Sequence, residues 1–492
     1  MQPFIGGRYK EVGPDKMVDA SLLTLSDPTF LPLNIIIMER DNLDFGTMHI
    51  PRLFVRLFVP TLLTLMFTAL FNIADGIFVG KGVGSDALAA INIVAPLFLI
   101  STGIALMFGT GASIVAAIHL ARDNAKAARI CTTQSLIAGT ALMLMVAVVV
   151  YVAPRWVGEV FGSSERLMPL VLDYMLYIMP SMVIMILNIA GVFIIRLDGA
   201  PNYVMVVHVV GSLLNIFLDW LFIFPLQMGV KGAAIATSLT EAIVGLLTLY
   251  YICCRARTLR FYRLRCSLKS LRLSLRNVGY MVKMGAPTFV GETAMSCMMI
   301  AGNYMFITRL GEDGVAAFSV ACYTFPLVFM FGNAVAQSAQ PIISYNHGAG
   351  KRRRIGSTLR LSLIVAVACS LLTTVGNIWF CSGLIGCFLS SDSKAWQIAV
   401  EGFPLFSLSF VFFALNLVLI GYYQALEQAR AAIIFMTLRG YLLVIPAFAL
   451  LPQVVGNDGL WLAVPLSEFL TFACIMAFIV VRQRKRPVSI SE

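Results

Sequence analysis

The sequence is short of charge. Only 12% of its 492 residues are Asp, Glu, Lys or Arg, and 59% are hydrophobic, whereas about 25% of the residues of a soluble protein are charged. So little polar surface excludes soluble enzymes, secreted disulfide scaffolds and disordered regulators. Mean hydropathy is +0.86, and the long apolar runs do not alternate with polar residues as the strands of a membrane barrel do. The composition predicts an all-α polytopic membrane protein.

Several kinds of site are also missing. Most of the ten cysteines lie in apolar runs, where a thiol behaves as a small hydrophobic group, so no disulfide framework is predicted. The four histidines share no metal-ligand spacing with cysteine or with one another. No stretch has the pattern of a soluble nucleotide-binding domain, which excludes ATP as the energy source within this chain. We therefore expect no cofactor, no metal centre and no catalytic residue.

The N-terminus lacks the pattern of a signal peptide. Residues 1–37 carry three basic and four acidic residues, and no basic start is followed by a long apolar core. We expect residues 1–50 to form a disordered extension, with Met38 as a second candidate start.

Twelve apolar stretches are long enough to cross a bilayer. They divide into an N-terminal lobe over 51–254 and a C-terminal lobe over 280–482, joined by a basic linker over 255–279 and followed by a tail over 483–492. The predicted spans lie near 53–79, 87–118, 132–153, 168–195, 203–224, 230–253, 280–308, 314–344, 359–381, 397–423, 431–451 and 459–481.

Basic residues predict the orientation of these spans. Nine Lys or Arg and no acid occur between Arg255 and Lys283, and two further basic clusters lie over 351–354 and 482–486. All three are on the side reached after an even number of spans, and the opposite loops hold only six basic residues. The positive-inside rule then places both termini in the cytoplasm and the chain in the inner membrane. It also favours membrane lipids, rather than nucleic acid, as partners of the basic clusters.

The linker has an amphipathic pattern. Basic residues lie beside a set of apolar residues at helical spacing, namely Leu268, Leu271, Leu275 and Val278. Such a helix lies in the membrane interface, so we expect an interfacial linker helix here.

The two lobes repeat one pattern. A shift of 227 residues aligns Pro60 with Pro287, Gly84 with Gly311, Asp86 with Asp313 and Glu241 with Glu468. Six spans separate the copies, so both have the same orientation in the membrane. Parallel repeats of this kind are related by an axis along the membrane normal and enclose a cavity between them, which is typical of transporters.

Four motifs resemble those of the multidrug and toxic compound extrusion (MATE) transporters. They are FNIADGIFVG at 71–80, Arg196 with DGAPN at 198–202, LNIFLD at 214–219 and AQSAQPIISYN at 336–346. The last is most similar to the MepA-like and DinF-like bacterial branch. The resemblance runs from about residue 40 to 482. It implies twelve transmembrane helices in a V-shaped pair of lobes, ion-coupled export of organic cations, and Met38 as the natural start.

Ionisable side chains inside spans are costly, which makes each a candidate functional residue. Asp75 lies in the first span with Asn72 on the same helical face, and Asn215 and Asp219 share a face of the fifth. In the family, the matching positions form a carboxylate–amide cluster, and Asn188 in the fourth span matches a further member. Two carboxylates in one apolar pocket cannot easily both ionise, so we expect H⁺ coupling here, or Na⁺ held by Asp75, Asn188, Asn215 and Asp219. Alternatively, Asp219 only bonds a neighbouring helix.

Other polar residues in the spans are candidates for weaker roles. Pro60 and Pro287 each remove a backbone hydrogen bond and predict helix hinges. The candidates for a substrate cavity are Glu292, Gln337, Gln340, Tyr174 and Asn416. Gln337 and Gln340 share a face of the eighth span, where hydrogen bonds between helices are an alternative explanation.

The acids of the C-terminal lobe do not complete the sodium-site pattern that the resemblance to this branch implies. Some family members carry acids where this chain has Met295 and Phe413, which favours a proton site in the N-terminal lobe. Glu241 and Glu468 occupy equivalent positions in the two repeats, and a structural role in both is favoured over coupling.

We expect a monomeric antiporter that exports organic cations or other amphipathic compounds in exchange for H⁺ or Na⁺. The many Met, Phe and Tyr side chains suit a promiscuous site for flat cations. One alternative is a flippase for lipid-linked saccharides within the same superfamily. Another is an integral-membrane transferase or hydrolase, which needs catalytic groups clustered at one membrane face.

Overall fold

The structure, a computed structural model, describes residues 43–484 apart from 162, 265–266 and 387–388. Within that range ten helical segments are long and apolar enough to cross a membrane, and α9 passes through the seventh and eighth predicted spans as one further element. The described part of the chain therefore agrees with twelve spans. Met38, most of the expected extension and most of the expected tail lie outside the described residues.

Helices are the expected solution for a chain in lipid, because each backbone N–H and C=O then bonds within its own segment. Four of them begin with proline in the first turn, where its missing N–H costs nothing. The elements are α2 (Ile50–Gly82), α3 (Ser85–Ala121), α4 (Ala125–Val152), α5 (Pro154–Val160), α6 (Met168–Leu197), α7 (Pro201–Ile223), α8 (Gly229–Tyr250), η2 (Tyr251–Arg255), α9 (Leu268–Gly348), α10 (Arg352–Gly386), α11 (Lys394–Ser407), α12 (Ser409–Ala425), α13 (Ala429–Thr437), η3 (Leu438–Leu443), α14 (Val444–Val454) and α15 (Asp458–Arg484).

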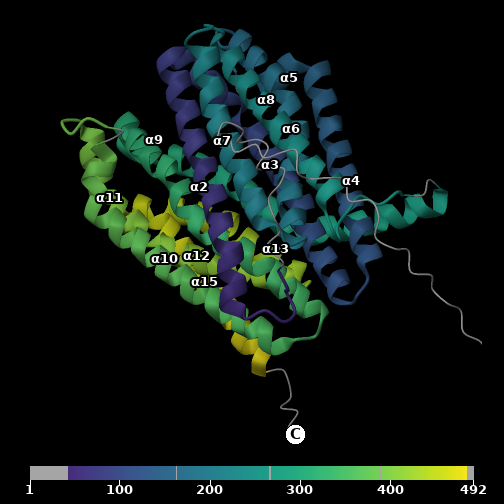
Figure 1. The fold of residues 1–492 in the computed structure, drawn as a ribbon. Helices are drawn as coiled ribbons and strands as arrows, with labels where there is room; N and C mark the ends of the chain where they lie inside the picture. Colours follow the sequence, from purple (N-terminus) through teal and green to yellow (C-terminus); the bar gives the residue numbers. More distant parts are fainter. Residues whose placement is uncertain (1–42, 162, 265–266, 387–388, 485–492) are drawn as a thin grey trace, which may run out of the picture. The chain divides into compact units, whose positions relative to one another are not determined.

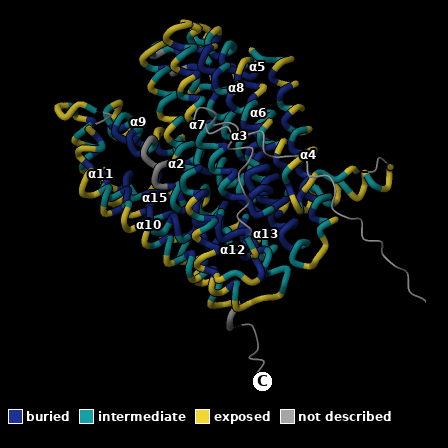
Figure 2. Tube along the Cα trace, in the orientation of Figure 1, coloured by how far each residue is buried: buried dark blue, intermediate teal, exposed yellow. Residues whose placement is uncertain are grey.

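The helices form two groups that follow the chain. In Figure 1 the purple to blue helices α2–α8 lie together, and the green to yellow helices α10–α15 lie together, with α9 reaching from one group to the other. Buried residues concentrate where helices run beside one another (Figure 2). In the spanning stretch of α6, 72% of residues are buried, against 22% in α10. α6 is therefore an inner helix of its lobe, and α10 turns most of its surface to lipid.

The turns between paired spans show the repeat in the backbone. Gly84 and Gly311, which are 227 positions apart, have φ of 116° and 68°. Positive φ is readily adopted only by glycine, so both positions require this residue. Gly84 separates α2 from α3. Gly311 interrupts α9 between the two predicted spans, so those spans are joined by one non-helical residue rather than by a loop.

Glycines also set the crossing of α3 and α9. A Cβ atom at Gly285 would lie 1.8 Å from the carbonyl oxygen of Met107, and one at Gly111 would lie 2.1 Å from that of Met281. The two backbones therefore touch where the N-terminal lobe meets the C-terminal lobe. Small residues at such a crossing allow the close packing that replaces the hydrophobic effect in lipid.

The expectation of disorder over 1–50 is wrong for the last residues of that range. Asp44 accepts hydrogen bonds from the backbone N–H groups of Gly46 and Thr47 at 2.7 and 3.0 Å and from the Thr47 hydroxyl. The Thr47 hydroxyl is the main reason that the pKa of Asp44 is lowered. Arg354 then donates to the carbonyls of Phe45 and Met48 at 3.1 and 2.7 Å. This segment is ordered because its turn bonds to itself and to the C-terminal lobe.

The linker forms the helix that its pattern predicts, as the first turns of α9. Ser267 caps it by accepting from the Ser270 N–H at 3.2 Å. Leu268, Leu271 and Leu275 are 89%, 58% and 65% exposed, and Figure 1 shows this part of α9 projecting sideways beside α4. An exposed leucine row beside basic residues is what an interfacial helix presents to a membrane.

The close crossing at Gly285 is testable. Gly285→Ala places a methyl group against the Met107 carbonyl, so we expect the free energy of unfolding in detergent to fall by about 1–3 kcal/mol, the usual cost of overpacking. Gly279→Ala is the matched control, since a Cβ there meets nothing within 4 Å and alanine is the better helix former. Equal denaturation midpoints for the two variants would contradict the described crossing.

Candidate functional site

Two acidic side chains lie near each other inside the N-terminal lobe, with no basic partner in the part of the chain that the structure describes. Asp75 comes from α2 and Asp219 from the neighbouring α7. Asp219 is 0% exposed, and both of its carboxyl oxygens, like Oδ1 of Asp75, are buried without a hydrogen-bond partner. The two groups lie close enough to interact electrostatically. Two neighbouring acids, one buried and one half-buried, are unfavourable as anions without a counter-charge, so they are suited to take up a proton or a cation.

Polar groups from three further positions lie near these two acids, on α6, α7 and α8. Asn215, one turn before Asp219, donates from Nδ2 to the hydroxyl of Thr237 in a long 3.5 Å hydrogen bond, and its Oδ1 is buried without a partner. Tyr174 of α6 is 9% exposed and near enough to both acids to be affected by their charge. Oxygen atoms from these side chains are the ligand type that hard cations prefer.

Two of the predicted cation ligands lie elsewhere. Asn72 shares a helical face with Asp75 but is exposed. Asn188 is buried, and its Nδ2 donates to the backbone carbonyl of Glu241 at 3.1 Å and to the Glu241 carboxylate. Thr237 was not among the predicted residues. The only indication of Thr237 in the sequence is its position, one helical turn before Glu241, an acid inside a predicted span.

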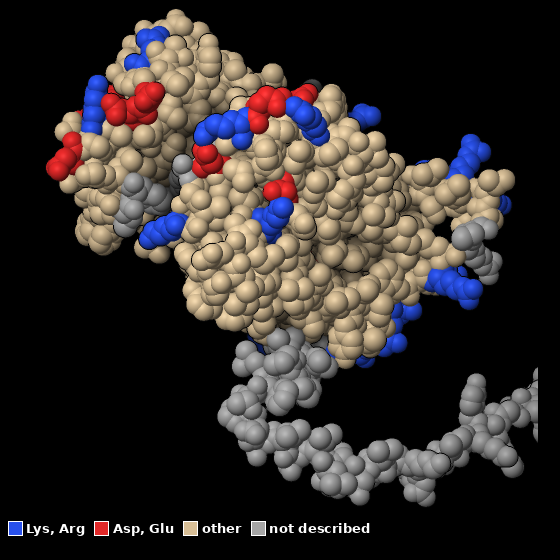
Figure 3. Space-filling view, turned by 90° about the horizontal axis from the view of Figure 1, so that it is seen from above, with Lys and Arg blue, Asp and Glu red and all other residues tan. Residues whose placement is uncertain are grey.

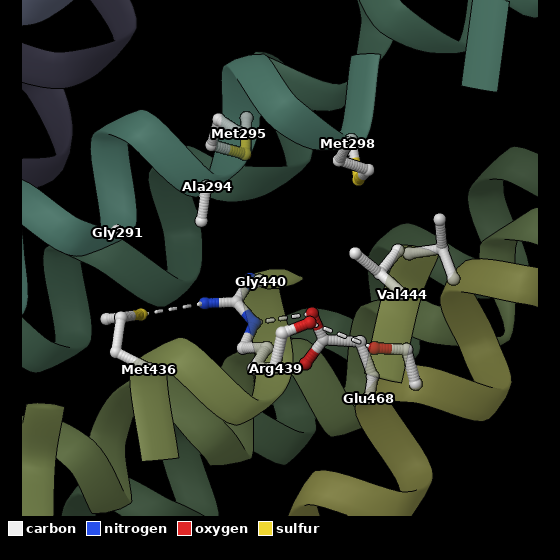
Figure 4. Close-up of a pocket in the computed structure, with 11 residues that line it drawn as sticks. Gly291, Ala294, Met295, Met298, Met436, Arg439, Gly440, Val444 and Glu468 are labelled. Atoms are coloured by element: carbon white, nitrogen blue, oxygen red, sulfur yellow. Dashed lines mark hydrogen bonds and ion pairs between the residues drawn. The ribbon is translucent and has the colours of Figure 1, made fainter. Parts of the chain in front are cut away.

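The C-terminal lobe holds a different polar cluster (Figure 4). Arg439 of η3 and Glu468 of α15 form an ion pair whose side chains are 10% and 5% exposed. Asn416 of α12 donates to the Glu468 backbone carbonyl at 2.9 Å and to its carboxylate at 2.8 Å. The Arg439 guanidinium lies over the ring of Phe413, 3.9 Å from the centroid. Phe413 therefore covers the cation.

A small cavity borders this ion pair. Its volume is about 30 Å³, and methionine side chains from α9 and α13 form much of its wall, namely Met295, Met298 and Met436. A space of this size admits water but no drug-sized molecule. Asn416 thus belongs to a charge-balanced cluster with Glu468 and Arg439.

Sequence analysis missed Arg439. It lies within the eleventh predicted span, where an arginine is costly and marks a site by itself. The chain is locally π-helical from Leu438 to Leu443, a rare conformation that often accompanies functional residues. The sequence therefore did point to Arg439, as a charged residue inside an apolar run.

The other candidates for the substrate cavity join the two lobes. Gln337 of α9 accepts from Nη1 of Arg196 at 2.9 Å, and Gln340 donates to the Thr110 carbonyl at 3.3 Å. Glu292 is half-buried and faces α3 near Gly103. The structure thus does not gather the five predicted cavity residues in one place, since Tyr174 lies beside the N-lobe acids and Asn416 beside Glu468. Their substrate role stays a prediction.

The predicted hinges are buried within helices. Pro60 lies inside α2, and the hydroxyl of Thr64 donates to its carbonyl at 2.8 Å. Pro287 is buried in α9, next to Thr288, whose hydroxyl lies 3.1 Å from that of Thr110 in α3. Movement at either proline stays a prediction.

Charges at one end of the molecule are mostly paired. Figure 3 looks onto the end that carries α5, where acidic and basic side chains lie next to one another on a largely uncharged surface. Arg155 pairs with Glu165 and Arg166 with Asp86, both at 2.7 Å. These are surface ion pairs, which contribute little to stability.

Two similar halves of apolar helices, with acids that have no basic partner among the described residues, are typical of an integral membrane transporter. The MatE family model matches residues 60–221 and again 287–449, and the chain belongs to this family of transporters. The two matches begin 227 residues apart and end 228 apart, which confirms the internal repeat. Membership also makes the protein a transporter rather than an integral-membrane enzyme.

Curated relatives cover nearly the whole chain. The sequence is 24% identical to an FAD transporter of Shewanella oneidensis over 429 residues, 86% of this chain and 92% of that protein. It is 22% identical to the multidrug export protein MepA of Staphylococcus aureus over 440 residues, 88% of this chain and 94% of that protein.

Solved structures share the fold. An outward-facing multidrug resistance MATE transporter of the MOP superfamily aligns with a TM-score of 0.79 at 22% identity, over 87% of this chain and 95% of that one. A Vibrio cholerae MATE transporter, VcmN, aligns with a TM-score of 0.81 at 18% identity, over 89% and 97%. These matches confirm the MATE fold.

The buried ion pair is testable by removing one partner. Arg439→Met leaves the Glu468 carboxylate buried without a counter-charge, so we expect the free energy of unfolding to fall by about 3–5 kcal/mol. The double variant Arg439→Met/Glu468→Gln removes both charges and is expected to recover most of that loss. If the single and double variants unfold alike in detergent, the pair is not the source of the stability.

Proposed function

We propose that this protein is a secondary active exporter that exchanges H⁺ or Na⁺ for amphipathic small molecules, organic cations foremost. The observation that carries the proposal is that half-buried Asp75 and fully buried Asp219 lie near each other with no basic partner among the described residues. The described part of the chain contains no nucleotide-binding domain that could use ATP. A cation gradient can drive transport only through a group that binds the cation. The carboxylates of Asp75 and Asp219 are such groups.

Cation binding would change the charge of the pocket and thereby favour one arrangement of its helices over another. A ligand shifts a conformational equilibrium only by its difference in affinity for the two states. Asp75 and Asp219 come from two different helices, α2 and α7, so the separation of their charges depends on how these helices pack. Neutralisation lets the helices approach, and release of the cation drives them apart. The buried Pro60 in α2 gives that helix a place to bend.

The relatives support export as the direction of transport. The name of MepA describes multidrug export, and the protein aligns over 88% of this chain. Buried Tyr174 offers an aromatic face, which suits an organic cation.

The same proposal includes the place of the protein in the cell. We expect a monomer in the cytoplasmic membrane with both termini inside, because the basic clusters follow an even number of spans. The exposed leucines of the α9 linker helix would then rest on the cytoplasmic leaflet.

Asp75→Asn tests the coupling assignment in liposomes. Wild-type protein is expected to move a fluorescent cationic dye against an imposed proton or sodium gradient, tested separately. Asp75→Asn should lose about 90% or more of this driven transport, since an amide cannot exchange its charge with the coupling ion. The control is Asp86→Asn, which removes an exposed acid at the ion pair with Arg166. Equal driven transport by wild type and Asp75→Asn would contradict the assignment.

A second candidate substrate is an anionic dinucleotide such as FAD. The S. oneidensis relative is named an FAD transporter and is similar over 86% of this chain. At the contact between the lobes, Arg196 is 3% exposed, and its Nε is buried without a partner. An arginine with an unused donor is a typical group for binding phosphate.

Transport assays with each of the two substrate classes distinguish these candidates. If FAD is the substrate, liposomes with wild-type protein should export FAD but not cationic dyes, and Arg196→Gln should slow FAD export by about tenfold or more, the effect of one lost charged hydrogen bond. If dyes move and FAD does not, the organic-cation proposal holds. Gln337→Glu is a useful companion, because it neutralises Arg196 without removing it.

A further inference from the structure

The same asparagine–glutamate pair occurs once in each lobe. In the N-terminal lobe, Asn188 Nδ2 donates to the backbone carbonyl and to the carboxylate of Glu241. In the C-terminal lobe, Asn416 Nδ2 donates to the same two groups of Glu468. The asparagines are 228 positions apart and the glutamates 227, the two spacings of the family matches. The pairs are therefore copies of one arrangement.

The copies differ in their counter-charge. In the C-terminal lobe, Arg439 completes the arrangement with an ion pair to Glu468. The positions that correspond to Arg439 in the N-terminal lobe are Gly211 and Ser212, which are buried and uncharged. A side chain at Gly211 has no room, because its Cβ would lie 2.6 Å from Cγ2 of Val244. The N-terminal copy thus keeps the acid and lacks the fixed cation.

Glu241 has no basic partner in the described part of the chain. Its one interacting side chain there is Asn188. Several charged or titratable groups belong to helices packed against α8, and none of them pairs with it: Arg52, Arg56, Asp75, Lys81, Asp173, Arg196, His208 and Asp219. Asn188 is 2% exposed, and its Oδ1 is buried without a hydrogen-bond partner. The Oδ1 of Asn416 is also buried without a partner, so the two copies differ only in the counter-charge of the glutamate.

We infer that Glu241 is a second binding site for the coupling cation. The cation pairs with this carboxylate as the Arg439 guanidinium pairs permanently with Glu468 in the other lobe. A carboxylate oxygen is a hard donor suited to a proton or to Na⁺. A bound cation makes the N-terminal copy neutral, as Arg439 makes the C-terminal copy neutral.

Side chains connect this site to the pocket of Asp75 and Asp219. Thr237 lies one turn before Glu241 on α8 and accepts from Asn215, which lies one turn before Asp219 on α7. Asp219, Asn215, Thr237, Glu241 and Asn188 thus form a row of oxygen-bearing groups across three helices. The cation enters at one acid and moves along the row to the other, so that at most one of the two sites needs to be charged.

The inference rests on the proposed cation-coupled export, and its test uses the repeat as its own control. Full-length Glu241→Gln and Glu468→Gln are purified and compared with wild type by thermal unfolding and by gradient-driven dye transport in liposomes. Glutamine keeps a carbonyl oxygen to accept from the asparagine in both lobes. The two variants make the same chemical change, and only Glu468→Gln leaves a buried arginine without its partner.

The expected results differ between the lobes. Glu241→Gln should unfold at or above the wild-type temperature, and its driven transport should fall by about tenfold or more, while exchange of dye without a gradient persists. Glu241→Asp, which keeps the charge, should restore part of the driven transport. Glu468→Gln should unfold well below wild type, because Arg439 is then buried unpaired.

Two results would overturn the inference. One is driven transport by Glu241→Gln at the wild-type rate, which would show that no coupling ion uses this site. The other is a loss of stability in Glu241→Gln equal to that in Glu468→Gln, which would mark the residue as structural. Failure of the proposed function itself is recognised separately, because wild-type transport would then respond to neither the proton nor the sodium gradient.

Discussion

An ionised acidic side chain inside a helix bundle in lipid is unfavourable without a positive charge nearby, and Glu468 differs in this respect from the paired acids of the N-terminal lobe. In the C-terminal lobe the charge is built in, since Arg439 pairs with Glu468 and packs on Phe413. Among the described residues of the N-terminal lobe, Asp75 and Asp219 have no such partner. In the function we propose, the coupling ion supplies the missing charge, and the N-terminal lobe is the half that responds to it.

Because the two lobes are repeats, equivalent positions in them can be compared directly. The glycine turns at 84 and 311 and the asparagine–glutamate pairs are common to both. The carboxylates of Asp75 and Asp219, in contrast, occur only in the N-terminal copy. At the corresponding spacing, the positions of Asp75, Asn215 and Asp219 are occupied by Gly302, Leu443 and Ala447. The C-terminal lobe instead packs aromatic rings, with Phe306 and Phe318 stacked at 4.6 Å.

Much of this organisation could be predicted from the sequence, because it depends on composition and period. Apolar runs predicted the spans, a fixed shift predicted the repeat, and an acid within an apolar run pointed to Asp75. What could not be predicted depends on neighbours. Helical spacing places Asn72 on the face of Asp75, but it does not say that this position is exposed. Asn188 was expected beside Asp75, yet it bonds to Glu241, because a buried amide bonds to the nearest acceptor.

The central claim is that the buried acids of the N-terminal lobe carry the coupling ion, and ion release on substrate binding tests it most directly. Purified protein in weakly buffered detergent is mixed with a transported substrate while pH and free Na⁺ are recorded. We predict that wild type releases one of the two ions on binding, and that Asp75→Asn/Asp219→Asn binds substrate without releasing either. Equal release by the double variant and wild type would contradict the account.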